Sequence, residues 1–590
     1  MKIFFASILF SLIFYTTAQN SQLANQFYSQ GDYDKAAQEY QSLLAKYPYN
    51  KQYLYRLVQI YQKQGKYEEV DKLLNNKKEM KTPSSMVWLG YNYLLRNDSI
   101  KASVLFDKAI EKSMKSSYMV YQTGKAFQEV YQLDKALVLY TKASKQFPDS
   151  SFLIDKGKIY AEKNDTGKMI EAYLDFLEIN PQNLLRIRYF LTPYISASEG
   201  NRDLDIIKRH IIERISKNPL PVYYRLLEWF YVQEQNYKKA FMQLRSLYAK
   251  NEAGIEEIFY LGNKALEKNQ AGTATRIFKY VKEHAQKKSL KEKARLALLK
   301  IKLRNYEKAD DELDALFETY TKENWEPVNR KNLLMLYSDY LAFYKNRSGE
   351  ALEILDELLK APLSRQGQAQ VKLKKGDIYM QQGLFNKALI LFTQVQLDFP
   401  NHHLGRLATY KIAQASFFKG DIEWAHNQLK VIKTVHSDLI SNDAIDLDML
   451  IINNKQENDS LQTALKNLAK IKYLIFKNKK TEAITQLDSL KTDFKGQSIY
   501  DDILWIQGNL FEEKGNFDRA MANYTEILNF PGESLYKDDA LFRLAGIYEH
   551  QLGDISKAKN MYKQIITDYP GSFWFTDARK AFRRLRGDDL

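Results

Sequence analysis

Small and aromatic residues recur along this chain at a spacing of four, which is the spacing of neighbours on one helix face. Ala36 precedes Tyr40 by four positions, and Ala136 precedes Tyr140 by the same distance. Residues i and i+4 lie one above the other on an α-helix, so each pair marks an apolar stripe that must pack on another helix. The pattern predicts a chain built from amphipathic helices.

Turn signals separate these helices at a regular period. Gly31 and Gly65 each open a Gly-x-Tyr turn, and they stand 34 residues apart. Further glycines occupy equivalent turns: Gly383, Gly420, Gly515 and Gly553. Prolines follow several of the second helices, where the residue before proline disfavours helical geometry: Pro48, Pro148, Pro181, Pro400 and Pro570. A period of about 34 residues predicts an array of helix–turn–helix units.

A second set of small residues falls in the first helix of many units. These are Gly90, Gly124, Gly262, Gly376, Gly508 and Gly546. We expect each to lie where the two helices of a hairpin touch, because a small side chain lets helices approach closely. Asn164 stands where one turn glycine is expected, and asparagine tolerates the left-handed conformation that the turn needs.

With these residues in place, the chain resembles the tetratricopeptide repeat family over most of its length. The resemblance implies an all-α fold, a right-handed α-solenoid superhelix of about 15 repeats with a C-terminal capping helix. We expect arrays over residues 19–285, 286–452 and 460–590. Weak repeats at 184–219 and 437–480 are either hinges or diverged but ordinary repeats.

In this family the first helix of each repeat lines a concave, protein-binding groove. Counted from the pattern, the fifth position of that helix is aromatic in five units, and four residues later comes an amide or a lysine. The candidate groove residues are Tyr55, Gln59, Tyr121, Lys125, Phe259, Asn263, Tyr410, Gln414, Trp505 and Asn509. Aromatic anchors flanked by amides suit an extended peptide or an amphipathic helix. The alternative is that these aromatics pack between neighbouring first helices.

The first 18 residues have the pattern of a cleaved signal peptide. Lys2 supplies a positive start, residues 3–15 are apolar, and Thr16-Thr17-Ala18 precede the expected mature start at Gln19. We therefore expect export to the periplasm. The chain has no cysteine, which excludes disulfides, thiolate metal sites and a lipoprotein anchor on an N-terminal cysteine. Its Lys-, Asn- and Tyr-rich composition resembles that of secreted proteins of the Bacteroidota.

The net charge is +15, and one stretch is denser in basic residues than the rest. Lysines and arginines crowd residues 282–304, which form either solvated helix faces or a patch for an acidic partner. No nucleic-acid motif accompanies them, and no later segment has the apolar length of a membrane span.

No motif of catalysis or cofactor binding occurs. The sequence lacks H-E-x-x-H, a phosphate-loop lysine motif and a Gly-rich dinucleotide turn, and its seven histidines show no ligand spacing. We expect no enzyme, no cofactor and no metal. The sequence favours a scaffold or adaptor that binds envelope or outer-membrane components. The alternatives are a periplasmic chaperone for unfolded exported or outer-membrane proteins, and a glycan-associated protein.

Overall fold

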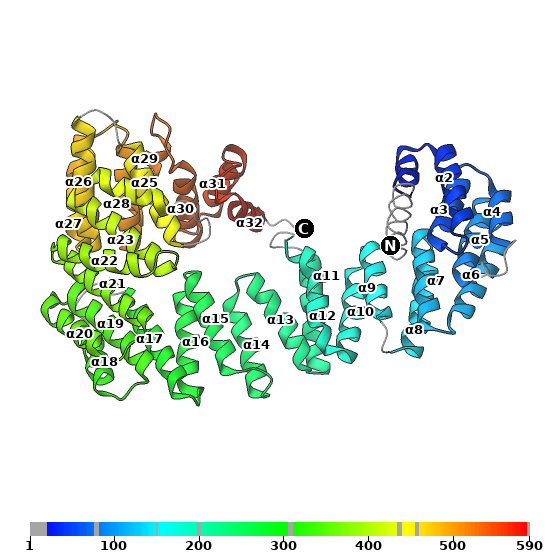
Figure 1. The fold of residues 1–590 in the computed structure, drawn as a ribbon, viewed down its shortest axis with the longest axis horizontal. Helices are drawn as coiled ribbons and strands as arrows, with labels where there is room; N and C mark the ends of the chain where they lie inside the picture. The colour runs from blue at the N-terminus through cyan, green and yellow to red at the C-terminus, as the bar shows by residue number, and fades with distance from the viewer. Residues whose placement is uncertain are drawn as a thin grey trace, which may run out of the picture. The chain divides into compact units, whose positions relative to one another are not determined.

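The computed structural model describes residues 21–75, 82–148, 151–196, 202–304, 311–432, 439–454 and 459–586 (Figure 1). Every regular element in these ranges is a helix, and no strand occurs among them. The prediction of an all-α solenoid is confirmed. The expected number of repeats stays a prediction.

The chain divides into two compact units, which are described separately. The first unit comprises residues 1–194 and 203–227, and the second comprises residues 195–202 and 228–590, so the division falls within α13 (Pro221–Gln233). The expected arrays at 19–285, 286–452 and 460–590 are not tested by this division and stay a prediction. The other helices of the first unit are α2 (Tyr33–Lys46), α3 (Lys51–Lys63), α4 (Tyr67–Asn75), α5 (Pro83–Leu95), α6 (Ser99–Ser113), α7 (Ser117–Glu129), α8 (Leu133–Gln146), α9 (Phe152–Glu162), α10 (Thr166–Ile179), the 3-10 helix η2 (Pro181–Asn183), α11 (Leu184–Ser196) and α12 (Arg202–Lys217).

The second unit carries the remaining helices. They are α14 (Tyr237–Ala249), α15 (Ile255–Glu267), α16 (Ala271–His284), α17 (Lys288–Arg304), α18 (Asp311–Lys322), α19 (Pro327–Phe343), α20 (Ser348–Lys360), α21 (Arg365–Gln381), α22 (Phe385–Asp398), α23 (His403–Lys419), α24 (Ile422–Ile432), α25 (Leu439–Asn453), α26 (Asp459–Phe476), α27 (Lys480–Asp493), α28 (Tyr500–Glu513), α29 (Phe517–Leu528), α30 (Lys537–His550), α31 (Ile555–Asp568) and α32 (Phe575–Arg586).

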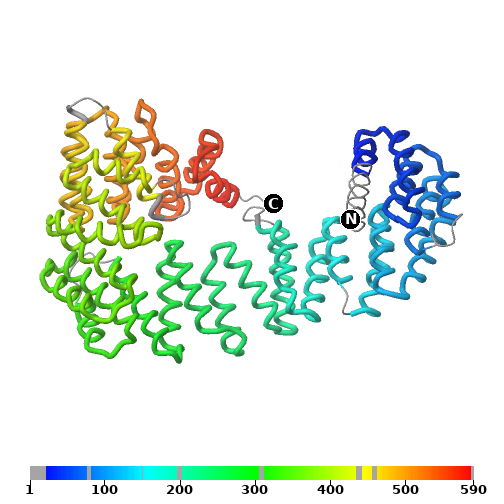
Figure 2. Tube along the Cα trace, viewed as in Figure 1, coloured from blue at the N-terminus to red at the C-terminus, as the bar shows by residue number. Residues whose placement is uncertain are grey.

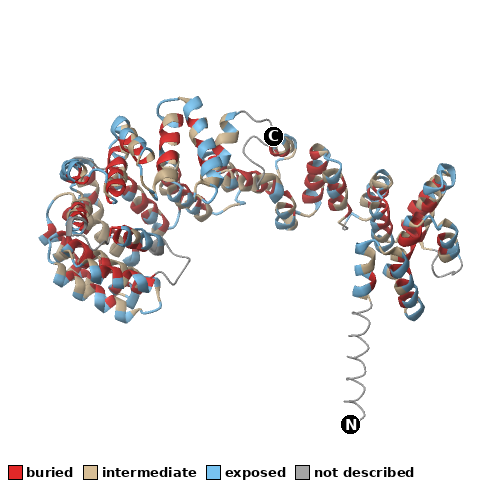
Figure 3. Ribbon diagram, turned by 90° about the horizontal axis from the view of Figure 1, so that it is seen from above, coloured by how far each residue is buried: buried red, intermediate tan, exposed pale blue. Residues whose placement is uncertain are grey.

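Within each unit, consecutive helices pair as antiparallel hairpins (Figure 2). We call the N-terminal helix of a hairpin its first helix. First helices also contact one another, as α5 contacts α7 and as α19 contacts α21, so the hairpins stack in chain order. Buried residues line the helix faces that meet, and the outward faces are exposed (Figure 3). At the end of the second unit, α32 buries Ala578 and Ala581 as the expected capping helix.

The turns have the left-handed backbone that the glycine spacing predicts. The six glycines of the Gly-x-Tyr set and its equivalents all have positive φ, with 80° at Gly31. Asn164 takes the same conformation with φ of 56°, so asparagine replaces glycine as predicted. Other turns have the same positive φ at a residue other than glycine: Asn97, Tyr131, Gln235, Asn269, Asn346 and Asn478.

Six glycines are predicted to lie in the seam, the contact between the two helices of a hairpin. Five of these seam glycines lie there. A Cβ on Gly124 would come within 2.1 Å of the Tyr140 hydroxyl oxygen, and one on Gly376 within 2.3 Å of the Phe392 ring. A Cβ on Gly90, Gly262 or Gly508 would also lie too close to a ring of the second helix, at 2.6–2.7 Å. Gly157 makes the same contact with Tyr173, which the sequence analysis missed.

The prediction for Gly546 is wrong. Nothing lies within 4 Å of a Cβ built there. Ala545, one position earlier on α30, is fully buried and packs in the same cluster as Ala558 and Tyr562, whereas Gly546 is only partly buried.

Helices α25 and α26 depart from the simple hairpin pattern. Both contact α23, and α26 pairs with α27 as the next hairpin. The C-terminal end of α26 reaches far back along the chain. The Tyr473 hydroxyl donates to the carbonyl of Met380 at 2.8 Å, and the Phe476 ring lies 5.5 Å from Phe343 of α19. The weak repeat at 437–480 therefore contains a helix that is anchored to upstream hairpins.

The seam contact gives a direct test of stability. Replacing Gly376 with alanine forces a methyl group into the buried Phe392 ring, and we expect a loss of about 1–3 kcal/mol from overpacking. The matched control, Gly546→Ala, fills open space in the same unit and should gain about 0.5–1 kcal/mol from helix propensity. Urea unfolding of the two variants measures the difference. Equal stabilities would contradict the role given to the seam.

Candidate functional site

The ten predicted groove residues lie on five first helices, and the structure brings four of them together. Tyr410 and Gln414 of α23 line a cavity of about 650 Å³ with Trp505 and Asn509 of α28. The cavity lies wholly within the second unit. Residues 95 positions apart therefore share one site, which we call the α23–α28 cavity.

The other six predicted residues lie outside this cavity. Tyr55 stacks on Trp88 of the next first helix, with ring centroids 5.6 Å apart, and its neighbour Gln59 is partly buried. Phe259 packs against Phe278 of its own hairpin, and Asn263 is partly buried beside it. On α7 both members of the pair are exposed, Tyr121 and Lys125. Partner binding at these positions stays a prediction.

The cavity exists because α25 and α26 are placed between α23 and α28. Phe418 of α23 and Phe476 of α26 pack together at 5.5 Å and form an apolar wall. A second aromatic wall of the cavity holds Trp505 and Tyr536, whose rings stack in parallel at 5.2 Å with 14° between planes. An aromatic lining with polar groups beside it suits a ligand that presents both apolar and polar groups.

Four carboxylates and one ammonium group line the cavity. The carboxylates belong to Asp443 and Asp446 of α25, Glu513 of α28 and Asp539 of α30, and the ammonium group to Lys472 of α26. Glu513 forms an ion pair with Lys480 at 2.8 Å, and Asp539 accepts a hydrogen bond from the Trp574 indole at 2.6 Å. Asp443 and Asp446 have neither a hydrogen bond nor an ion pair with any residue that the structure describes.

The cavity perturbs the protonation of its charged groups. Desolvation raises the pKa of Asp443, with a further rise from Asp446, while Lys472 opposes it. Desolvation likewise raises the pKa of Asp446. Desolvation lowers the pKa of Lys472, against the attraction of Asp502, Asp446 and Asp443. The surroundings thus disfavour the charged form of each group, and a ligand of opposite charge would favour it.

A buried polar cluster lies directly behind the cavity. Asp502 accepts hydrogen bonds from the Tyr536 hydroxyl and from the Asn454 side-chain amide, both at 2.7 Å. Burial raises the pKa of Asp502 to about 6, and the two donors only partly offset that rise. This cluster fixes the orientation of the Tyr536 ring, on which Trp505 stacks.

The sequence analysis missed the acidic residues of this site. Asp443, Asp446 and Lys472 lie on α25 and α26, which break the hairpin pattern that was used to count positions. One signal was present. Asp443 and Asp446 are three residues apart on α25 and so share one face, whereas the third aspartate of the helix, Asp448, is fully buried beside His426.

Upstream first helices neutralise their carboxylates within the fold. Asp339 of α19 pairs with Lys374 of α21 at 2.7 Å, and Asp377 of α21 pairs with Lys411 of α23 at 2.6 Å. We call this series the lysine–aspartate ladder. It ends at α23, immediately before the acidic pair of α25.

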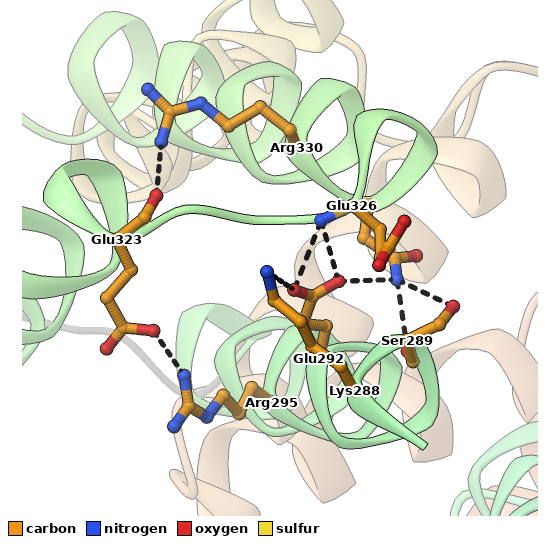
Figure 4. Close-up of polar contacts among 8 residues, drawn as sticks. Lys288, Ser289, Glu292, Arg295, Glu323, Glu326 and Arg330 are labelled. Atoms are coloured by element: carbon orange, nitrogen blue, oxygen red, sulfur yellow. Dashed lines mark hydrogen bonds and ion pairs between the residues drawn. The ribbon is translucent and has the colours of Figure 1, made fainter.

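Four of the nine lysines and arginines in the basic stretch at 282–304 form ion pairs with described residues of the protein. Lys287 pairs with Glu256 at 2.8 Å, and Arg295 pairs with Glu323 at 2.5 Å. Figure 4 shows the Arg295 pair beside the buried Glu292, which accepts from the backbone N–H of Glu326 and from Asn329 just before and within the first turn of α19. These charges hold α17, α18 and α19 together. Binding of an acidic partner there stays a prediction.

The described residues form neither a metal-binding cluster nor a membrane-spanning helix. Nowhere in those ranges do three or more His, Asp or Glu side chains gather in a way that could hold a metal ion. Among the same residues, none of the helices combines the length and apolarity needed to cross a membrane.

The buried Asp502 predicts a pH dependence of stability. Its folded pKa of about 6 exceeds the usual 3.8, so the folded state binds the proton more tightly. Unfolding free energy from this group is therefore highest near pH 4 and falls as pH rises through 6, by up to about 3 kcal/mol. Urea unfolding of wild type and Asp502→Asn across this range isolates the effect. The wild-type stability minus the variant stability should decrease toward pH 7, and a flat difference would contradict the assignment.

Comparison with known proteins matches three stretches of the chain to one family of repeats. Profiles described as Tetratricopeptide repeat match residues 27–76, 150–183 and 539–572. A search of curated proteins finds no match. Two solved structures align over 97% of this chain with a TM-score of 0.26: "Structure of Naa15/Naa10 bound to HypK-THB", at 13% identity over 94% of that chain, and "Crystal structure of APC/C hetero-tetramer Cut9-Hcn1", at 12% identity over 98%. At these TM-scores the alignments support no inference about this chain. The three profile matches, in both units, support the tetratricopeptide repeat family for this protein.

Proposed function

We propose that this protein is a non-enzymatic interaction scaffold of the bacterial cell envelope that holds a segment of a partner protein in the α23–α28 cavity. The observation that carries the proposal is the convergence of two predicted groove pairs on one cavity. Tyr410 and Gln414 come from one first helix, and Trp505 and Asn509 from another. First-helix aromatics and amides thus meet at one binding surface.

The cavity has the chemistry that a polypeptide segment requires. Trp505 and Tyr410 offer apolar area at a small cost in side-chain entropy, which is the usual property of interface anchors. Gln414 and Asn509 can pair with backbone groups, because an amide both donates and accepts. A volume of about 650 Å³ accommodates several side chains of such a segment.

The envelope location rests on the sequence. The segment over residues 1–18 has the charged start, apolar run and small-residue site of a cleaved signal peptide. The composition resembles that of exported Bacteroidota proteins. The partner in this proposal is therefore an envelope or outer-membrane component, met in the periplasm.

One observation favours the chaperone as a second candidate. The first unit exposes large side chains on two first helices, with Tyr118 and Tyr121 on α7 and Leu185 and Tyr189 on α11. Exposed apolar side chains of this size are available to unfolded clients. A chaperone would suppress the aggregation of unrelated unfolded proteins, whereas a scaffold would bind one folded partner at fixed stoichiometry.

Crosslinking and affinity purification of the tagged mature chain from its native envelope test the scaffold. We expect one dominant set of partners at fixed stoichiometry. In a binding assay with that partner, Tyr410→Ala should weaken the affinity by about 30-fold, the effect of losing a buried anchor of roughly 2 kcal/mol.

Tyr260→Ala is the matched control, because Tyr260 is an exposed tyrosine of the same unit outside the cavity. It should bind as wild type does. A broad set of unrelated exported proteins in the purification would instead favour the chaperone. Equal loss in both variants would remove the cavity from the binding surface.

A further inference from the structure

We propose that the α23–α28 cavity is built for a basic segment of its partner, with an arginine or lysine side chain seated against Asp443 and Asp446 between the aromatic walls. This inference rests on the proposed function and names the chemistry of the bound segment. It runs against the first expectation from net charge, since a chain of +15 suggests acidic partners.

The first argument is the charge imbalance of the lining. Lys472 is the one cation among the cavity-lining residues, and it faces four carboxylates. Glu513 and Asp539 are engaged by Lys480 and Trp574, so the unmatched charge belongs to Asp443 and Asp446. Both side chains are exposed, and no described residue pairs with them. Lys472 attracts both carboxylates but forms no ion pair with either, so the lining keeps an excess of negative charge that attracts a cation.

The second argument is the contrast with the rest of the same helix series. Along the lysine–aspartate ladder, Asp339 and Asp377 each meet a lysine from the next first helix within 2.7 Å. A carboxylate on this surface is therefore normally matched from the following hairpin. At α25 neither Asp443 nor Asp446 forms such an ion pair with a described residue, although Lys472 of the following helix attracts both, and all three line the cavity. The partner would supply the cation that the fold supplies elsewhere.

The third argument is the position of Asp446. It lies near enough to Tyr410, Tyr536 and Asp539 to raise the pKa of each, so its carboxylate is central in the cavity. In the proposed complex the aliphatic stem of the arginine or lysine lies along Trp505 and Tyr536, which line the same cavity. The stem is apolar and the head is charged, which matches aromatic walls around an acidic centre.

The test is fluorescence anisotropy with the mature chain and labelled short peptides. The first peptide contains Leu-Arg-Tyr-Arg, and the second carries citrulline in place of each arginine, which keeps the shape and removes the charge. We expect the arginine peptide to bind about tenfold or more tightly than the citrulline peptide. Higher salt should weaken the arginine peptide more.

Two variants should change the affinity for the arginine peptide in opposite directions. Asp443→Asn with Asp446→Asn should weaken the arginine peptide by about tenfold or more, because two charge-assisted contacts are lost. Lys472→Met should tighten it several-fold, because the only competing cation is removed. The matched control is Asp493→Asn with Asp518→Asn, which removes two exposed carboxylates of the same unit outside the cavity and should change little.

Several results would overturn the inference. They are equal affinity for the citrulline peptide, unchanged affinity in the Asp443 and Asp446 variant, tighter binding of a glutamate peptide, or competition by free spermidine as effective as that by the peptide. A chain that ignores the arginine peptide yet captures one envelope partner keeps the scaffold function and loses this inference. Arginine-peptide binding without capture of any partner would remove the scaffold function instead.

Discussion

The structure depends on one close contact, the approach of a first helix to its second helix across a residue without a side chain. At Gly124, Gly157 and Gly376 the ring of the second helix occupies the space that a Cβ would need. Each hairpin is thereby held near the short end of the usual helix separation, and each presents a flat apolar face to the next hairpin. Stacking follows from that face, because no single hairpin can bury it alone.

The candidate site arises where this regularity is interrupted. A solenoid made only of equal hairpins offers a continuous surface of first helices. Placing α25 beside α23 and turning α26 back toward α19 separates α23 from α28 and creates walls on several sides. The same departure brings in charges that the repeat pattern does not contain. The regular repeats therefore supply the scaffold, and the irregular pair supplies the chemistry.

Much of the fold could be predicted because it is encoded locally. Positive φ at Gly31 and Asn164 follows from the residue type and its place in the period. The failure at Gly546 is instructive, since its spacing to Tyr562 equals that of the other seam pairs. There the preceding residue, Ala545, is the one buried against the second helix, and spacing alone does not reveal this one-residue change.

The site was harder to predict from the sequence, because it also depends on packing that residue spacing does not reveal. Counting positions identified Tyr410, Gln414, Trp505 and Asn509, but it did not indicate that these four share a cavity while Tyr55 stacks on Trp88. That distinction depends on contacts between residues far apart in the chain. Asp446 and Lys472 lie on helices that do not follow the 34-residue repeat, so counting positions within the repeat could not identify them as site residues.

The contact of α26 with upstream hairpins has a mechanical consequence. A repeat stack is elastic, because load passes only from each hairpin to its neighbour and small rotations add along its length. Tyr473 bonded to the Met380 carbonyl and Phe476 against Phe343 fasten α26 across several hairpins at once. This fastening stiffens the region from α19 to α26 against bending. Strain on the second unit would then concentrate outside that region, and the wall of the cavity formed by Phe418 and Phe476 would keep its shape while flanking hairpins flex.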